Sequence, residues 1–132
     1  MNWKKFLLQG GSASVLSIIT CVIYQKIYTG TFETDFSAVL NIGGIIGASI
    51  FGCMLIALGY ALIEKWNRPQ WTGLLNVLIV GLSLASLISP LAITLPLDME
   101  SPELFPGLAI PMHLFPALAF LTIVPFFDSN KQ

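Results

Sequence analysis

The hydrophobic and polar positions along the chain divide it into four long apolar runs, joined by short polar segments. A helix needs about 20 mostly apolar residues to cross the hydrocarbon core of a bilayer, and each run is long enough. The sequence therefore predicts a single membrane domain over residues 1–132, with spans at 6–24, 38–63, 71–89 and 107–127.

The first run has a second interpretation, because lysines ahead of an apolar stretch are typical of a secretory signal peptide. Lys4 and Lys5 precede this run, but the run is long, and no small-x-small cleavage site leads into a polar mature domain. We therefore expect residues 6–24 to form a retained helix.

The connections between the runs differ in character. Residues 25–37 are a polar loop, and residues 64–70 are a tight hairpin flanked by Trp66 and Trp71. Tryptophan favours the headgroup level of a membrane, which places this hairpin at the surface. Residues 90–106 are rich in proline and acids, and we expect an extended outer loop on the membrane surface rather than a fifth span.

Composition supports the same fold class. Of the 132 residues, 55% are hydrophobic and only 10% are charged, and the mean hydropathy is +0.82. A soluble domain usually carries about 25% charged residues, because its surface faces water. We therefore expect an all-α integral membrane protein, a four-transmembrane-helix bundle.

The basic residues give this bundle a direction, because cytoplasmic loops carry an excess of lysine and arginine. With both termini inside (N-in/C-in), Lys26 alone lies outside, and the other basic residues are cytoplasmic: Lys4, Lys5, Lys65, Arg68 and Lys131. Most of the acids then fall outside: Glu33, Asp35, Asp98, Glu100 and Glu103. The sequence predicts a multi-pass protein of the cytoplasmic (inner) membrane with both termini cytoplasmic.

Small residues recur at four-residue spacing in the second run. Gly43 and Gly47 form a GxxxG pair, and Ala48 and Gly52 repeat the small-xxx-small spacing. Such residues let helix backbones approach closely in lipid. We expect this helix-packing face to contact another helix of the same chain; the alternative is a homo-oligomer or a partner in a membrane complex.

His113 is the only histidine, and it lies inside the fourth run. One interpretation is a neutral histidine hydrogen-bonded to a neighbouring helix. The other is a polar group in an outward-facing pocket beside a kink at Pro116, which cannot donate to the carbonyl of Met112. Polar residues at the same predicted level would complete that ligand-binding cavity: Thr20, Tyr24, Ser86 and Ser89.

Several functional classes are disfavoured. No acid, lysine or arginine lies in the middle of a run, whereas ion-coupled transporters usually place one there. Cys21 and Cys53 lie at different predicted depths, so we interpret both as unpaired core residues. One histidine supplies neither paired haem ligands nor a zinc site. We expect no catalytic residue, metal, cofactor or nucleic-acid partner, and we expect Asn76 to bond across helices.

The fourth run reads PGLAIPMHLFPALAFLTIVPFF, with a Met112-His113 pair and a closing Val-Pro, and it follows a third run that ends in serine and proline. Residues 71–127 resemble an uncharacterised family of small bacterial four-span membrane proteins, a domain of unknown function. The resemblance implies a four-span fold in a bacterial inner membrane, and it implies no activity.

Three functions fit these patterns. The first is a small non-enzymatic membrane protein, structural or accessory, or a subunit of a membrane assembly that packs through the second span. The alternative is a binder or carrier of a lipid or other apolar ligand in an outer-leaflet cavity near His113. A lipid-modifying enzyme is the least favoured, because it would need an acid beside His113. Membrane lipids are the expected partners in each case.

Overall fold

The computed structural model describes residues 2–128, and within that range it contains helices and no strand. The elements are α1 (Trp3–Phe32), α2 (Ile42–Lys65), η1 (Pro69–Trp71), α3 (Thr72–Ser86), α4 (Ile88–Ala92), η2 (Pro102–Leu104) and α5 (Phe105–Asp128). Four helical stretches are long and apolar enough to cross a membrane: Trp3–Phe32, Ile42–Lys65, Pro69–Ala92 and Pro102–Asp128. The predicted all-α chain with four such helices is confirmed.

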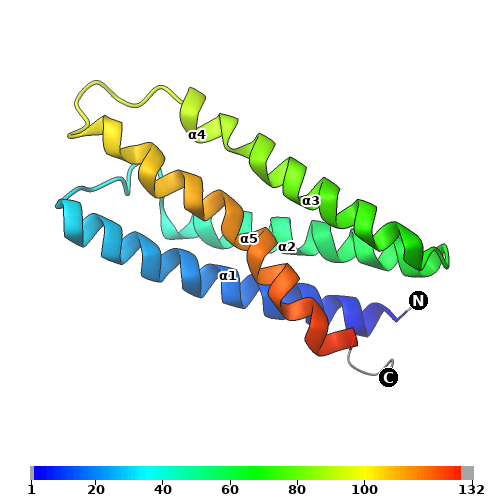
Figure 1. Ribbon diagram of the computed structural model, residues 1–132. Coiled ribbons are helices and arrows are strands. Elements are labelled where there is room, and N and C mark those ends of the chain that lie inside the picture. The colour runs from blue at the N-terminus through cyan, green and yellow to red at the C-terminus, as the bar shows by residue number, and fades with distance from the viewer. Residues whose placement is uncertain (1, 129–132) are drawn as a thin grey trace.

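The four long helices run side by side and reverse direction at each connection (Figure 1). The start of α1 and the end of α5 lie at one end of the bundle, together with the turn between α2 and η1; we call this the termini end. The opposite end, the loop end, carries residues 33–41 and 93–104. At the termini end Lys5 Nζ lies 2.9 Å from Asp128 Oδ1 and 3.7 Å from Glu64 Oε2, so one ammonium links three helices.

α1 extends to Phe32, so the predicted loop from residue 25 is wrong in its first part. Two tyrosines explain the extension: Tyr24 at the end of the predicted span, and Tyr28 within the added stretch. Tyr24 Oη donates to the carbonyl of Gly107, and Tyr28 Oη donates to the carbonyl of Leu104, both at 2.7 Å. A helical backbone holds both rings on one face against α5, which a loop would not do.

α2 begins at Ile42 rather than at 38, because the preceding residues form a turn around a buried aromatic ring. The N–H groups of Val39 and Leu40 donate to the carbonyl of Phe36, whose fully buried ring packs edge-on to Phe105. Asn41 then caps the helix, since its side chain accepts from the Gly44 N–H at 2.7 Å.

The third span does not end against Pro90 as predicted. α3 stops at Ser86, a turn at Leu87 follows, and α4 carries the chain through Pro90 to Ala92. A proline has no N–H to donate to the carbonyl four residues before it, and for Pro90 this is the carbonyl of Ser86. The helix therefore breaks where this backbone hydrogen bond is missing. The extended part of the outer loop is therefore shorter than 90–106, and α5 is slightly longer than 107–127.

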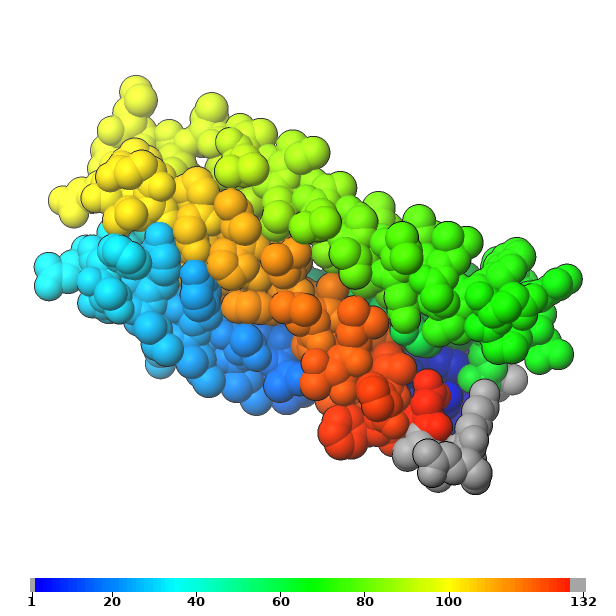
Figure 2. Space-filling view, in the orientation of Figure 1, coloured from blue at the N-terminus to red at the C-terminus, as the bar shows by residue number. Residues whose placement is uncertain are grey.

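The core is built by α1, α2 and α5, while α3 lies apart. In the most apolar part of Pro69–Ala92 only 11% of the residues are buried, against 33% to 39% in the other three stretches. Ile79 is the one buried residue of α3. The atoms of α1 and α5 adjoin over much of the face in view in Figure 2, and α3 forms a separate ridge beside them.

Glycines set the closest helix approaches, but these are not the ones that GxxxG spacing predicts. A Cβ atom added at Gly10 would lie 2.7 Å from Met54 Sδ and 3.1 Å from Ala57 Cβ, so Gly10 seats α1 on α2. Gly52 makes a similar contact with α5. Gly43 and Gly47 are exposed and touch no other helix, so the expectation that they pack within the chain is wrong for this pair.

Candidate functional site

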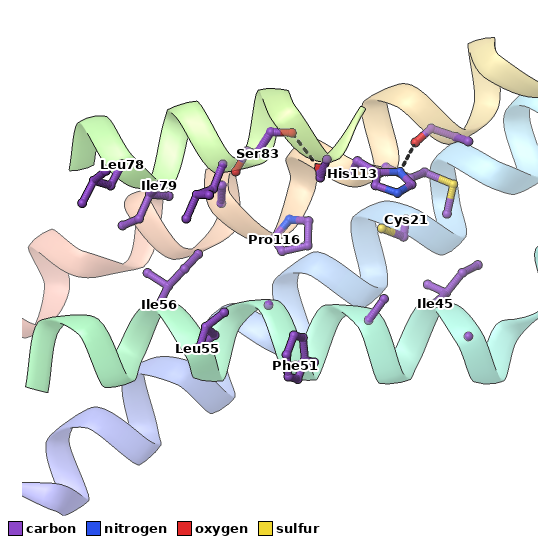
Figure 3. A pocket seen from close by; sticks show the side chains of 18 of the residues that line it. Cys21, Ile45, Phe51, Leu55, Ile56, Leu78, Ile79, Ser83, His113 and Pro116 are labelled. Carbon is purple, nitrogen blue, oxygen red and sulfur yellow. Dashed lines mark hydrogen bonds between the residues drawn. The ribbon is translucent and has the colours of Figure 1, made fainter. Parts of the chain in front are cut away.

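The separation of α3 from the core leaves a cleft of about 620 Å³ between α2, α3 and α5. Figure 3 looks into it: Leu78, Ile79 and Ser83 of α3 face Phe51, Leu55 and Ile56 of α2, with His113 and Pro116 of α5 between them. Cys21 of α1 closes the cleft at the loop end. Ligand sites typically have volumes of about 300–1,000 Å³ and mainly apolar walls, which describes this cleft.

The polar side chains of the cleft gather toward its loop end. Ser83, Ser86 and His113 lie there, and the other half is walled by aliphatic residues such as Leu75, Ile79 and Ile56. On α2 the lining extends from Gly44 to Ile56, which corresponds to about 18 Å at ~1.5 Å rise per residue. The cleft is therefore amphipathic along its length, with a polar head and an apolar tail.

His113 presents one ring nitrogen to this polar head. Its Nδ1 lies 2.8 Å from the carbonyl oxygen of Ala109, one turn earlier in α5. A carbonyl oxygen can only accept, so Nδ1 carries the proton, and in the neutral ring Nε2 is then an acceptor. Nε2 has no hydrogen bond to the described residues. The predicted bond to a neighbouring helix is wrong, because the partner belongs to the same helix.

The serines of α3 are arranged differently. Ser86 Oγ donates its proton to the carbonyl of Ser83 in the same helix, at 2.6 Å. The lone pairs of Ser86 Oγ can therefore still accept a hydrogen bond from a ligand. Ser83 is half-buried in the cleft wall. A ligand group placed here meets acceptors from Ser86 and His113 and the rotatable hydroxyl of Ser83.

Of the five residues predicted to share a cavity, the structure brings His113 and Ser86 together and leaves out Thr20, Tyr24 and Ser89. Thr20 Oγ1 donates to the carbonyl of Leu16 within α1. Tyr24 packs edge-on against Phe115 and bonds to Gly107. Thr20 therefore bonds within α1, and Tyr24 fastens α1 to α5. Ser89 lies beyond the break at Leu87.

Two features of the cleft were missed from the sequence. Ser83 lies one turn before Ser86 on the same face of α3, a spacing that could have identified it. The contact of Gly52 with Pro116, which forms the floor, joins residues far apart in the chain, and no local pattern signals it. Of the predicted packing residues, Ala48 and Gly52 line the cleft.

Several other polar groups of the helices are paired with one another. Ser17 Oγ donates to Ser49 Oγ between α1 and α2, and Cys53 Sγ lies 3.6 Å from the carbonyl oxygen of Pro116. Tyr60 Oη donates to Asn76 Oδ1, so the predicted bond of Asn76 across helices is confirmed. Cys21 and Cys53 are buried free thiols. These contacts hold the bundle together and offer nothing to a ligand.

The cleft lacks the groups of hydrolytic or metal chemistry. None of its lining residues is an acid, and His113 bonds to a backbone carbonyl rather than to a carboxylate. Within residues 2–128 no three His, Cys, Asp or Glu side chains come close enough to hold a metal ion. The arrangement suits binding of an amphipathic molecule by shape and by a few hydrogen bonds.

Comparison of the chain with protein-family models, with curated proteins and with solved structures gave no match. The resemblance of residues 71–127 to an uncharacterised four-span family stays a prediction.

Proposed function

We propose that this protein binds a lipid or a lipid-like molecule in the cleft between α2, α3 and α5. One observation carries the proposal: a largely apolar space of about 620 Å³ ends in an unpaired histidine nitrogen and a serine pair. Helices that pack only with one another need no such space, and in a bilayer it would be filled by hydrocarbon.

The chemistry of the cleft selects the ligand. His113 Nε2 accepts a hydrogen bond, so the head of the ligand carries a donor such as a hydroxyl or an amide N–H. The tail lies along Leu78 and Leu82 toward Leu75. A neutral long-chain alcohol, acylglycerol or amide satisfies both requirements, and a bare hydrocarbon satisfies only the second.

We propose further that the protein lies in the cytoplasmic membrane of a bacterium with both termini in the cytoplasm. The termini end carries Lys4, Lys5, Lys65 and Arg68, and the loop end is acidic, which fits the positive-inside rule. In this orientation the polar head of the cleft belongs to the outer half of the bilayer. The role is binding or carriage rather than catalysis, because no acid accompanies His113 in the cleft.

Mass spectrometry of lipids that co-purify with the protein in mild detergent tests the proposal. Leu82 and Leu84 offer a matched pair on α3: both are exposed leucines, and only Leu82 lines the cleft. Leu82→Trp should fill the cleft and remove the co-purified lipid, while Leu84→Trp should retain it. Equal lipid content in both variants would exclude the cleft as the binding site.

A second candidate is a subunit role through α2. Gly47 faces outward, and a Cβ atom added there meets nothing within 4 Å, so the face is free to receive a helix of a second copy or of a partner. Gly47→Leu should convert an oligomer to a monomer in native mass spectrometry. A wild-type protein that is already monomeric would remove this candidate.

A further inference from the structure

A second cavity lies at the termini end of the bundle, about one helical turn beyond the cleft: Tyr60 lines this cavity, and Ile56, four residues earlier on α2, lines the cleft. Its volume is about 160 Å³, and all four long helical stretches contribute to it through the residues at their ends. Unlike the cleft, it has charged side chains in its lining: Lys5, Glu64, Arg68 and Asp128, with Gln9 and Asn67 beside them and with apolar residues such as Phe6 and Ile63. We call it the termini-end pocket.

Gln9 is the buried member of this set. Its side chain is 1% exposed, yet its Oε1 atom has no hydrogen-bond partner among the described residues. A buried amide oxygen without a donor is costly, and native proteins rarely leave one so. An occupant of the pocket that donates a hydrogen bond would satisfy Gln9 Oε1.

The charged side chains around Gln9 differ in how fully they are paired. Lys5 Nζ is held by Asp128 Oδ1 at 2.9 Å, and Glu64 Oε2 is farther away at 3.7 Å, so the Glu64 carboxylate keeps acceptor capacity. Arg68 lies over the Trp71 ring, 6.0 Å from its centroid, and has no carboxylate partner within residues 2–128. The Glu64 side of the pocket can thus accept hydrogen bonds from a bound cation, and the Arg68 side can pair with a bound anion.

We propose that the termini-end pocket binds a zwitterionic group that carries a primary ammonium and a phosphate. The ammonium donates to Gln9 Oε1 and to Glu64, and the phosphate pairs with the Arg68 guanidinium. The two cations and two carboxylates of the pocket balance, so a ligand without net charge keeps the site neutral. Trp66 and Trp71 place this end at headgroup level, where phosphatidylethanolamine supplies that group.

The number of N–H donors makes the proposal specific. A primary ammonium has three N–H donors, whereas the quaternary ammonium of phosphatidylcholine has none and cannot satisfy Gln9. Native mass spectrometry of the full chain in detergent should therefore retain phosphatidylethanolamine over phosphatidylcholine of the same acyl chains by roughly tenfold. Phosphatidylglycerol has no ammonium for Glu64 and should be retained less than phosphatidylethanolamine.

Two substitutions separate binding from folding. Gln9→Leu should abolish the preference for ethanolamine over choline, and circular dichroism establishes that this buried variant still folds. Arg68→Gln changes an exposed side chain, so it removes no contact of the core. This variant should lower the retention of all three phospholipids. The cleft variant Leu82→Trp should leave the preference intact, because Leu82 lies ten residues along α3 from Thr72, the residue of that helix that lines the termini-end pocket.

Competition with soluble phosphoethanolamine identifies the source of the group. If millimolar phosphoethanolamine displaces the lipid, the pocket recognises the headgroup alone; if it does not, the acyl chains contribute and the ligand is the membrane lipid. Equal retention of ethanolamine and choline lipids overturns the proposal, since it would mean that water alone satisfies Gln9. A preference that survives both Gln9→Leu and Arg68→Gln overturns it as well.

Discussion

Gly52 of α2 and Pro116 of α5 meet at the floor of the cleft, and the absence of a side chain on Gly52 permits the contact. A Cβ atom added at Gly52 would lie 3.2 Å from Pro116 Cβ and 3.7 Å from Pro116 Cγ. A proline ring cannot rotate away, so an added side chain must move a helix backbone. This close approach brings α2 against α5 beneath the cleft, together with the contact of Cys53 Sγ with the Pro116 carbonyl.

We predict that Gly52→Val destabilises the bundle by about 1–3 kcal/mol, the usual cost of overpacking a closely packed interior. Thermal unfolding in detergent, followed by circular dichroism, measures the change. Gly47→Val is the matched control on the same helix, because no atom lies within 4 Å of its added Cβ. Equal losses in the two variants would show that β-branching in the helix, rather than Pro116, is responsible.

The unpaired Nε2 of His113 gives a second prediction. His113→Leu should weaken binding of a long-chain alcohol by roughly tenfold, because the hydroxyl loses its acceptor. Binding of an alkane of the same length should change little, since the alkane donates no hydrogen bond. Thr20→Val provides the control: Thr20 bonds within α1 and lies outside the cleft, so it should leave both affinities unchanged. Fluorescence displacement in micelles measures each affinity.

The apolar pattern of the sequence was enough to predict four membrane-length helices, because burial in lipid imposes one length on each run. Their ends were predicted less well. The extension of α1 depends on Tyr24 and Tyr28 reaching the carbonyls of Gly107 and Leu104, which are distant in sequence. Such contacts leave no local signature, and the predicted loop followed only the polarity of residues 25–37.

The site was predicted in part for a related reason. Helix depth can be read from the sequence, and it placed Ser86 and His113 at one level. The rotation of each helix about its axis cannot be read in a uniformly apolar span, so Thr20 and Tyr24 were wrongly assigned to the same cavity. The departure of α3 from the core is a tertiary property, and residues such as Leu78 and Leu82 gave no sign of it.

Asp35 gives a pH-dependent prediction at the loop end. The Ser37 N–H donates to Asp35 Oδ1 at 2.9 Å, and this hydrogen bond lowers the pKa of the carboxyl below its ordinary 3.8. A depressed pKa in the folded state means that the bond stabilises the turn above pH 3.8 and is lost as the pH falls through the lower folded value.

The Ser37 amide resonance should therefore shift in NMR spectra recorded below pH 4, and Asp35→Asn should abolish this titration. The Val39 amide is an internal control, because it donates to the carbonyl of Phe36 and should not follow the carboxyl. A Ser37 shift that persists in Asp35→Asn would assign the titration to another acid of the loop end.

The hydrogen bond from Tyr60 to Asn76 joins α2 to α3 near the termini end, where the cleft closes. Few other contacts hold α3, since Ile79 is its one buried residue. Tyr60→Phe keeps the packing of the ring on Phe120 and removes only the hydroxyl. We expect a loss of about 0.6 kcal/mol, typical of an interhelical hydrogen bond in a membrane, together with a wider distribution of α2–α3 distances.

Double electron–electron resonance between labels at Leu58 and Val77, both exposed, measures that distribution. Tyr28→Phe removes a hydroxyl at the other end of the bundle, between α1 and η2, and should leave the distribution unchanged. If Tyr60→Phe also leaves it unchanged, packing of Ile79 and Leu75 alone positions α3, and the width of the cleft does not depend on this bond.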